Sequence, residues 1–450
     1  DPAVSALDDA LALTARWCAI PSHAGDPASQ MRQARELRSW LSGELGAALL
    51  TSSPSEAEPA PVILARIDSG SARTVLLYNM YDVMPATPEG WLHDPWAGGI
   101  ADMPGIGRAF VARGAENNKG PLAGMLIALR DLKRSGRLRV NVEILLDGQE
   151  ERASPALRRW LAAPDCPLRP SAGALFPSFC EYGGGPPRLY LGFSGMAKGR
   201  LEVAAGGWGG PARAIHSSNA PWIANPVRVL VDVLARIGGP ETGELAQIDL
   251  DADAARVVAA LARDFDPAAE LRFRHAACFA RPRYGCLDPE ALLRHVLTTA
   301  SFNIATLATD PVAGDAVIPA AATAAFDLRA PPSLAPDALV AGIRDLLAAE
   351  PAFAGAALCV DDSYPGARVL ESAAGVRALH DAYAGGPAPQ VWPWAIGAAP
   401  AYAFGRHTES FLIGGSGRGG NAHGVNEFLH IEGFGRFIAS VSAWIQGMAA

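Results

Sequence analysis

The chain has 450 residues, of which 50% are hydrophobic and 19% are charged, so it is long enough to bury the cores of two or three domains. Its formal net charge is −8 and no Lys/Arg cluster stands out, which argues against nucleic acid as a partner. No apolar run reaches about 20 residues, so a membrane span is not expected.

The N-terminal residues and the cysteines bear on where the protein resides. Residues 1–17 are expected to form an amphipathic helix and do not read as a signal peptide. The cysteines contain no C-x-x-C pair, so the default expectation is reduced, mostly buried thiols. We therefore predict a cytoplasmic protein; the cysteines are Cys18, Cys166, Cys180, Cys278, Cys286 and Cys359.

Strand and helix signals alternate in the first half of the chain. Residues 73–80 (RTVLLYNM) and 139–146 (RVNVEILL) are apolar runs typical of buried strands. Between them, residues 119–133 have apolar side chains at helical spacing, with Gly136 as the expected stop. This order predicts a βαβ unit in a parallel sheet, where functional residues gather beyond the carboxyl ends of the strands.

Two adjacent carboxylates follow the second predicted strand. Glu150 and Glu151 belong to the segment DGQEE at residues 147–151. Adjacent like charges are unfavourable unless a neighbouring group compensates them. An exposed polar loop is the simpler interpretation of such a pair, but the position directly after a core strand favours a functional site.

The rest of the chain is predicted to contain an inserted domain and a return to the first domain. A segment of α+β character begins near Lys198, and a Pro/Gly-rich stretch at residues 385–400 is expected to be the linker back. A glycine-rich loop at 414–424 carries His423, and a terminal helix is expected at 428–449. The predicted domains are a first domain formed by residues 1–197 and 381–450 and an inserted domain formed by residues 198–380.

Several segments, in this order, resemble motifs of the M20 metallopeptidase family, which includes aminoacylases and carnosine dipeptidases. YNMYDVMPATPEGWLHDPW is similar to the family pattern GHYDV-PA…GW-DPF, and RGAENNKGPLAG to RGA-DDKGP-AG. LLDGQEERASP is similar to EGQEE-GSP, and GGNAHGVNE to GAH-PNE. Inside the inserted domain, AIHSSN and DLRAPP stand where the family has a His-Ser pair and an Arg-containing strand.

The resemblance implies an α/β fold: a catalytic domain with a mixed, mostly parallel sheet sandwiched by helices, plus an inserted α+β lid. It also implies two metal ions bridged by one Asp, a metal-bound water that attacks an amide, and a Glu that serves as general base. A His from the partner's lid would stabilise the oxyanion. On this basis we expect a homodimer through the lid and a small amino-acid or peptide-like substrate.

The positions of the metal ligands depart from the family pattern. Met80 stands for the first ligand His, and Asn117 stands for the bridging Asp. Our alignment places Ser178 at a further Asp ligand, although Glu181 lies close enough in sequence to substitute for it. Met80 is interpreted as a side chain that fills the space of a histidine; a soft ligand for Cu(I) is the weaker alternative.

Other positions keep the family's residue types. Glu150 matches the general base, whereas Glu151 and His423 match ligands of the same metal site, and the other site loses its own ligands at Met80 and Ser178. Asp82, which in the family steadies the first ligand His, is present without that His. With so few carboxylates, two dications would leave uncompensated charge in a partly buried cavity. The main prediction is a metal-free site, and the alternative is a single weakly bound zinc on Glu151 and His423.

The residues expected to contact the substrate have changed as well. Arg329 matches the lid Arg that holds a substrate carboxylate, and His216 matches the oxyanion His. Asn303 is expected near the same cleft, and Trp394 replaces an Arg in the family's substrate loop. For Arg329 and His216 a plain surface role stays open, as does a plain core role for Trp394. The remaining candidate substrate contacts are Asn117, Met80, Ser178 and Ser416.

Three functions are compatible with these residues. The first is an enzyme that reuses the cleft without zinc, with Glu150 as acid/base and with Glu151, His216 and His423 as further catalytic residues. Loss of metal-bound water would favour acyl transfer, amide formation, cyclisation or isomerisation over hydrolysis. The second is a residual single-metal amidohydrolase or dipeptidase, and the third is a non-catalytic binding protein, because a fold does not fix a function.

Overall fold

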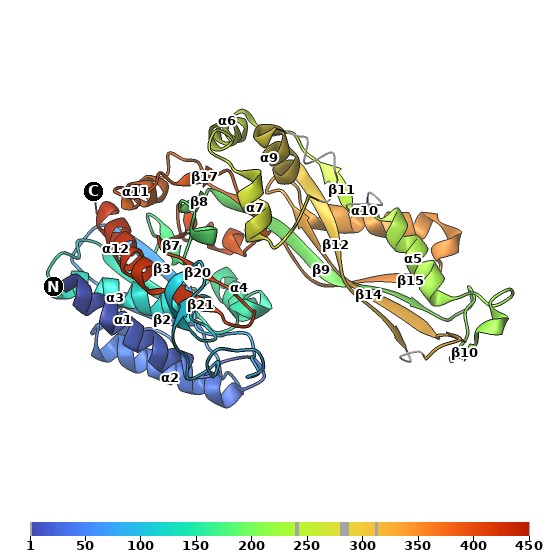
Figure 1. Cartoon of the computed structure of the whole chain (residues 1–450), viewed down its shortest axis with the longest axis horizontal. Helices are drawn as coiled ribbons and strands as arrows, with labels where there is room; N and C mark the ends of the chain where they lie inside the picture. Colours follow the sequence, from blue (N-terminus) through green and yellow to red (C-terminus); the bar gives the residue numbers. More distant parts are fainter. Residues whose placement is uncertain (1, 239–242, 280–287, 311–313, 450) are drawn as a thin grey trace. The chain divides into compact units, whose positions relative to one another are not determined.

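The computed structural model describes residues 2–238, 243–279, 288–310 and 314–449, and the chain forms two compact units (Figure 1). Unit 1 comprises Asp1–Leu191, Val369–Trp392 and Ala403–Ala450, and unit 2 comprises Gly192–Arg368 and Pro393–Tyr402. An inserted second unit agrees with the order predicted from the sequence, but its limits differ from residues 198–380.

A single long strand explains the difference in limits. β9 (Gly192–Ala204) runs without interruption from the first residue of unit 2. Two short strands, β16 (Ala367–Arg368) and β18 (Ala395–Ala398), pair with the first residues of β9. Residues 393–402 therefore belong to unit 2, whereas the sequence predicts a linker at 385–400 and places the return at residue 381.

Unit 1 is built on a six-stranded mixed sheet in the order β1-β2-β6-β3-β7-β19. Pairing is parallel from β6 through β19 and antiparallel between β1, β2 and β6. All residues of β6 are buried, as is usual for a strand covered on both faces. The strands are β1 (Ala48–Leu49), β2 (Ile63–Ile67), β3 (Thr74–Met80), β6 (Asn141–Asp147), β7 (Ala174–Pro177) and β19 (Phe411–Gly414).

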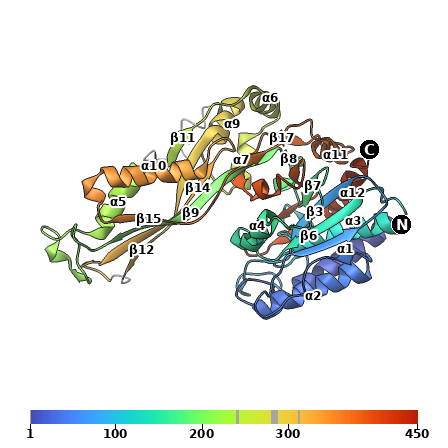
Figure 2. The same ribbon diagram turned by 180° about the vertical axis from the view of Figure 1, so that it is seen from behind.

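The described part of unit 1 also contains α-helices, of which α3 contacts both α1 and α12 (Figure 2). The predicted helix after residue 119 is α3, and Gly136 follows its end with a φ of +68°. The predicted terminal helix is α12, but residues 428–430 form a strand before it. The helices are α1 (Pro2–Cys18), α2 (Pro27–Gly43), α3 (Lys119–Arg134), α4 (Pro155–Ala162), α11 (Ala374–Ala382) and α12 (Ile431–Gly447).

Two smaller sheets complete unit 1. A four-stranded antiparallel sheet has the order β20-β21-β5-β4, and β17 pairs with β8 in parallel. The four-stranded sheet joins the segment before Asn117 to the segment that follows His423. The strands are β4 (Gly99–Met103), β5 (Gly107–Val111), β20 (Gly419–Gly420), β21 (Phe428–His430), β8 (Arg188–Tyr190) and β17 (Gln390–Trp392).

Unit 2 is an antiparallel sheet with helices packed on it. The strand order is β11-β12-β14-β9-β15, and α5 and α10 contact β9, β14 and β15. Residues of β14 alternate strictly between buried and half-buried, so one face of that strand belongs to the core. The strands of the sheet are β11 (Glu244–Gln247), β12 (Thr299–Asp310), β14 (Ala321–Ala330) and β15 (Ala356–Tyr364).

The core of unit 2 contains Leu201, Val233, Phe326 and Ile343, which come from β9, α5, β14 and α10. A two-stranded pair of β10 and β13 carries His216. The helices and short strands are α5 (Pro226–Arg236), α6 (Ala252–Leu261), α7 (Pro267–Phe273), α9 (Pro289–Thr298), α10 (Pro336–Ala349), β10 (Ile215–His216) and β13 (Val317–Ile318).

The cysteines agree in part with the prediction. Among the described residues, Cys18, Cys166, Cys180, Cys278 and Cys359 are free, but only Cys18 and Cys180 are buried. Cys278 is exposed and the other two are half-buried, so the expectation of mostly buried thiols is wrong. Cys286 lies outside the described residues. In the described ranges we find no helix that is both long and apolar enough to cross a bilayer.

Candidate functional site

The carboxyl ends of the parallel strands of unit 1 bring the predicted site residues to one edge of the sheet. β3 ends at Met80, and β6 ends shortly before Glu150 and Glu151. β7 ends at Pro177, directly before Ser178, and β19 ends two residues before Ser416. The edge therefore collects side chains from segments that are far apart in the sequence.

Asn117, Glu151 and His423 form a compact polar cluster. Nδ2 of Asn117 lies 2.9 Å from Oε1 of Glu151 and 3.0 Å from Nε2 of His423. Nε2 of His423 lies 3.0 Å from Oε2 of Glu151. The pKa of His423 is raised, chiefly by its hydrogen bond to Glu151. Protonated Nε2 and the amide of Asn117 therefore both donate to the same carboxylate, and the two nitrogens, 3.0 Å apart, are then both donors with no hydrogen bond between them.

Asp82 holds the loop that carries the paired carboxylates. Its Oδ1 accepts from the backbone N–H of Glu150 and its Oδ2 from that of Glu151, each at 3.1 Å. Asp82 is buried, with 3% of its surface exposed. Burial raises its pKa well above the usual range, while the two backbone donors act in the opposite direction. Asp82, whose histidine partner in the family pattern is replaced by Met80 here, thus holds the backbone of Glu150 and Glu151 in place.

Glu150 lies in an environment that favours its neutral form. Burial raises its pKa well above the usual value, and the charges of Glu151, Asp82 and Asp147 add to the increase. A carboxyl group whose neutral form is favoured in this way is better suited to act as a proton donor. Its carboxyl group makes no hydrogen bond or ion pair with another described residue. Glu150 is therefore available to a bound molecule.

A buried ion pair between Arg113 and Glu427 fixes the backbone of the segment that carries Asn117. Nη1 of Arg113 lies 2.5 Å from Oε2 of Glu427, and both side chains are almost fully buried. Oε1 of Glu427 accepts from the backbone N–H groups of Glu116 and Asn117 at 3.0 and 2.8 Å. Glu427 follows His423 by four residues, so one carboxylate ties the loop of His423 to the loop of Asn117.

A second amide network lies beside the cluster. Nδ2 of Asn118 donates to Oδ1 of Asn79 at 2.7 Å and to the carbonyl of Pro177 at 3.1 Å. Ser178 donates to Oδ1 of Asn118 at 3.2 Å. The side chain of Met80 has no exposed surface. Amide, hydroxyl and thioether groups thus occupy positions where the resemblance predicts metal ligands.

Glu181 and Ser416 are engaged elsewhere. Glu181, the alternative to Ser178 as a ligand, pairs with Arg436 of α12 at 2.6 Å. The backbone N–H of Ser416 donates to Oγ of Ser440, another residue of α12, at 3.0 Å. Neither residue makes a hydrogen bond or ion pair with the cluster of Asn117, Glu151 and His423 among the described residues.

The residues present do not fit the two-metal centre that the resemblance implies. Within the described ranges, no group of three or more His, Cys, Asp or Glu side chains is placed to hold a metal. The amide nitrogen of Asn117 has no lone pair to offer, and it faces the carboxylate and the imidazole that a metal would need. Binding a dication on Glu151 and His423 would require this amide to move and Nε2 to lose its proton.

The remaining candidate residues lie in unit 2. His216 is exposed, and its Nδ1 accepts from the backbone N–H of Ser218 at 3.2 Å. Nδ2 of Asn303 donates to Oδ1 of Asp327 at 3.4 Å. Arg329, on the same strand as Asp327, is 39% exposed and lines a pocket.

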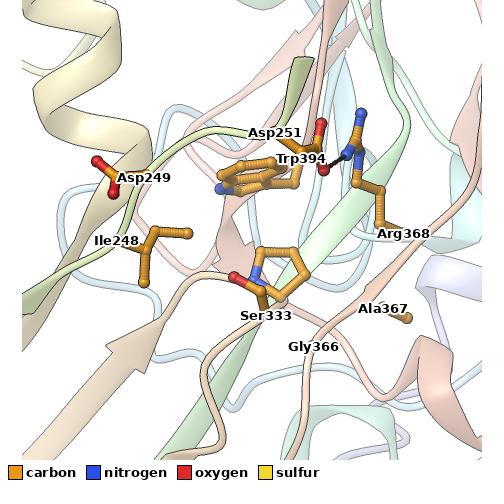
Figure 3. A pocket seen from close by; sticks show the side chains of 9 residues that line it. Ile248, Asp249, Asp251, Ser333, Gly366, Ala367, Arg368 and Trp394 are labelled. Carbon is orange, nitrogen blue, oxygen red and sulfur yellow. Dashed lines mark hydrogen bonds and ion pairs between the residues drawn. The ribbon is translucent and has the colours of Figure 1, made fainter. Parts of the chain in front are cut away.

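Trp394 lines another pocket of unit 2, where it lies beside Arg368 (Figure 3). Its Nε1 donates to the carbonyl of Leu297 at 3.1 Å, and 4% of its surface is exposed. Arg368 pairs with Asp251 at 2.8 Å and also with Asp253. The tryptophan is therefore part of the packing of unit 2, as well as a wall of that pocket.

Sequence reasoning missed Arg113, Glu116 and Glu427 as parts of the site. Burial and the charge of Glu427 raise the pKa of Glu116 to about 8. Oε2 of Glu116 is buried and makes no hydrogen bond with the described residues. All three lie inside the motifs RGAENN and GVNE, so their membership in those motifs was the available signal, but their contacts with each other were not visible in it.

Comparison with known proteins places the chain among peptidases. Residues 76–446 match the family described as peptidase family M20/M25/M40. A stretch of 117 residues is 35% identical to a Cys-Gly metallodipeptidase of Schizosaccharomyces pombe and covers 24% of each chain. A cysteinylglycine-S-conjugate dipeptidase of Corynebacterium striatum is 32% identical over 119 residues, or 26% of this chain and 25% of that protein. These alignments span only about a quarter of the relatives' length.

Solved structures resemble the chain over nearly its whole length. An M20 family metallo-carboxypeptidase of Sulfolobus solfataricus has a TM-score of 0.84 at 22% identity and covers 98% of this chain and 99% of its own. Human carnosine dipeptidase 1 has a TM-score of 0.79 at 20% identity, with coverage of 99% and 97%. At these identities the likeness establishes the fold.

Proposed function

The chain belongs to peptidase family M20/M25/M40, and from this premise we propose that it is an enzyme that acts on an amide or amino-acid-derived substrate without a two-zinc centre. The observation that carries the proposal is the position of Asn117. Its amide nitrogen lies between Glu151 and His423, where it meets a carboxylate and an imidazole. A neutral amide at position 117 lacks the negative charge of the bridging carboxylate that would compensate a second dication.

Glu150 is the acid/base in this proposal. Its raised pKa results from burial and from neighbouring carboxylates, and it allows the group to give a proton to a leaving nitrogen or to a carbonyl oxygen. Glu151 and His423 hold each other in place and position the edge of the site. His216 keeps its proposed role toward an oxyanion and Arg329 toward a substrate carboxylate, and Asn303 stays a proposed substrate contact.

Without metal-bound water, the site lacks the nucleophile of its hydrolytic relatives. A nucleophile supplied by a second substrate, or by another group of the same substrate, would replace it. We therefore propose acyl transfer, amide formation or cyclisation as the reaction class, with isomerisation as a further member. We also propose that the protein forms a homodimer through unit 2. We propose a cytoplasmic location as well.

A single-metal amidohydrolase is the second candidate. The named relatives are a metallodipeptidase and a metallo-carboxypeptidase, and Glu151 and His423 lie within 3.0 Å of each other. One zinc on these two side chains would polarise an amide carbonyl and leave Glu150 as general base. This candidate requires the side chain of Asn117 to move away from both ligands.

Turnover after metal removal separates the two candidates. The full-length protein would be treated with EDTA, checked by elemental analysis and assayed by mass spectrometry with dipeptides and N-acyl amino acids, with and without an amine acceptor. We expect product from the metal-free protein and a loss of about 10²-fold or more in the Glu150→Gln variant. Glu44→Gln changes an exposed carboxylate at the end of α2 and serves as the matched control.

Activity that disappears with EDTA and returns with zinc would support the single-metal hydrolase instead. Full activity of the Glu150→Gln variant would remove Glu150 from the mechanism.

A further inference from the structure

Uncharged side chains join three segments at the carboxyl-end edge of the main sheet of unit 1. Asn79 lies near the end of β3, Asn118 lies directly before α3, and Ser178 lies directly after β7. The same segments carry the positions of the metal site whose own ligands are replaced in this chain. Those positions are occupied by Met80, Asn117 and Ser178.

Asn118 is the centre of an amide network that consists of Asn79, Asn118, Ser178 and the carbonyl of Pro177. Nδ2 of Asn118 donates to Oδ1 of Asn79 at 2.7 Å and to the carbonyl of Pro177 at 3.1 Å. Oδ1 of Asn118 accepts from the hydroxyl of Ser178 at 3.2 Å. Because Nδ2 faces two acceptors and Oδ1 faces a donor, all three contacts favour the same orientation of this amide.

Asn79 completes the amide network from the side of β3. Its Oδ1 also accepts from the backbone N–H of Met80 at 2.8 Å, and its Nδ2 donates to the carbonyl of Pro177 at 3.3 Å. The exposed fraction is 0% for Asn79 and 2% for Asn118. Rotating the amide of Asn79 would place Nδ2 against the N–H of Met80, so its orientation is fixed as well.

Neither asparagine follows from the family pattern or from local backbone structure. Asn79 stands where the pattern GHYDV has Gly, and Asn118 stands where RGA-DDKGP-AG has the second Asp. Asn118 is the N-cap residue of α3, a position where Asn commonly caps the helix, but its side chain makes no capping hydrogen bond. Both side chains are therefore committed to contacts between segments.

The amide network disfavours the carboxylates of the family pattern. Asn118→Asp would place an oxygen near the site of Nδ2, 2.7 Å from Oδ1 of Asn79 and 3.1 Å from the carbonyl of Pro177. Ser178→Asp would replace a donor to Oδ1 of Asn118 by an acceptor. Buried acceptors that face each other lose their hydrogen bonds, and the loss destabilises the fold.

We propose that Asn79 and Asn118 are positioning residues that replace one metal ion of the family as the cross-link between β3, β7 and the start of α3, and that they oppose the return of that metal. A metal would join these segments through charged ligands, whereas the amide network joins them without buried charge. The inference rests on the proposed function in one respect, the absence of a two-zinc centre. It is equally compatible with a single zinc on Glu151 and His423.

Restoring the ligands of the family pattern tests the proposal without any turnover. The ligand variant of the full-length protein is Met80→His/Asn117→Asp/Ser178→Asp, and the network variant carries Asn79→Gly and Asn118→Asp in addition. Both are freed of metal with EDTA, loaded with zinc and measured by elemental analysis; the visible absorption of bound Co²⁺ gives a second readout.

We expect about one zinc per chain in the ligand variant, held by Glu151, His423 and the carboxylate introduced at position 117. The network variant should bind about two, because the amides that conflict with the added carboxylates are gone. Circular dichroism establishes that each variant is folded.

A stability cycle tests the same contacts in single and double variants. Asn118→Asp should lower the urea midpoint, and in the Asn79→Gly background the decrease should be at most about half as large, because the shortest acceptor contact is absent. Asn141→Asp is the matched control. Its buried Nδ2 donates to the carbonyl of Ser71 at 2.7 Å, outside the amide network, so its effect should be equal in both backgrounds.

Two zinc ions in the ligand variant would overturn the proposal, and so would a single zinc in a folded network variant. If the network variant does not fold, the stability cycle decides, and equal effects of Asn118→Asp in both backgrounds would overturn it. Metal-free turnover by the wild-type protein together with two zinc ions in the ligand variant would refute only the amide network. Zinc-dependent turnover with one zinc in both the wild-type protein and the ligand variant would refute only the metal-free chemistry.

Discussion

Replacing Asn117 with Asp tests whether the amide at this position excludes a bridging metal. In the wild-type protein, Nδ2 of Asn117 donates to Oε1 of Glu151 at 2.9 Å. In the variant, two carboxylates would face each other near that separation. Two unit charges about 3 Å apart repel by about 5 kcal/mol at an effective dielectric constant of about 20. A shared proton or a bound cation would relieve this repulsion.

Solvent and His423 both reduce the effect. The side chain of His423 is 50% exposed although that of Glu151 is only 9% exposed, and the imidazole, 3.0 Å from the same amide, attracts the new carboxylate when it is protonated. We therefore expect Asn117→Asp to lose about 2 kcal/mol of unfolding free energy in EDTA. The measurement is urea denaturation followed by circular dichroism at pH 8. The carboxylate introduced by Asn117→Asp would also join Glu151 and His423 in a set of three protein ligands of the type that zinc binds. Zinc should therefore restore the stability of the variant, and elemental analysis should find about one zinc per chain.

The control is Asn421→Asp, which makes the same chemical change at an exposed position in the loop of His423. It removes one exposed hydrogen bond, from Nδ2 of Asn421 to the carbonyl of Asn426 at 3.0 Å, so it should change the unfolding free energy by less than about 1 kcal/mol and should show no response to zinc. The reasoning is refuted if Asn117→Asp is as stable in EDTA as the wild-type protein and does not respond to zinc. Wild-type protein that is purified with two zinc ions per chain would refute it more directly.

Two further predictions concern Glu427 and Glu116, two buried carboxyl groups next to the cluster of Asn117, Glu151 and His423. Glu427→Ala should lower the unfolding free energy by about 3–5 kcal/mol in urea denaturation, because Arg113 would keep a buried charge without a partner. Arg134→Ala, which breaks an exposed pair with Glu44, should cost less than about 1 kcal/mol, and equal losses would contradict the prediction. Because the pKa of Glu116 is raised from 4.5 to about 8, its contribution to stability is complete below pH 4.5 and is lost as the pH rises through 8. Stability should fall by up to about 1.4 kcal/mol per pH unit in this window, and Glu116→Gln should flatten the profile; an unchanged slope would show that Glu116 ionises normally.

Local sequence patterns were sufficient for the central elements of unit 1. The apolar runs that end at Met80 and Leu146 correspond to β3 and β6, because a strand buried on both faces needs continuous apolar residues. The helical spacing after Lys119 corresponds to α3. Patterns failed at the limits of unit 2, because the long strand β9 contains glycine and polar residues that do not mark a boundary.

The composition of the site was also largely visible in the sequence. Glu150 and Glu151 follow a core strand, and the motif resemblance named Asn117 and His423 as their companions. Substitution of ligand types by Met, Asn and Ser needs no coordinates to be recognised. The chemical argument against two dications therefore rests on residue identity and on charge.

Only the tertiary structure decided how these residues are held. The amide of Asn117 meets Glu151 and His423 because β5 and β21 pair and Glu427 binds the backbone of Asn117. Asp82 gained a partner in the loop after β6 because β3 and β6 lie side by side. Sequence motifs specify which groups are present, whereas hydrogen bonds act over about 3 Å and depend on the pairing of segments hundreds of residues apart.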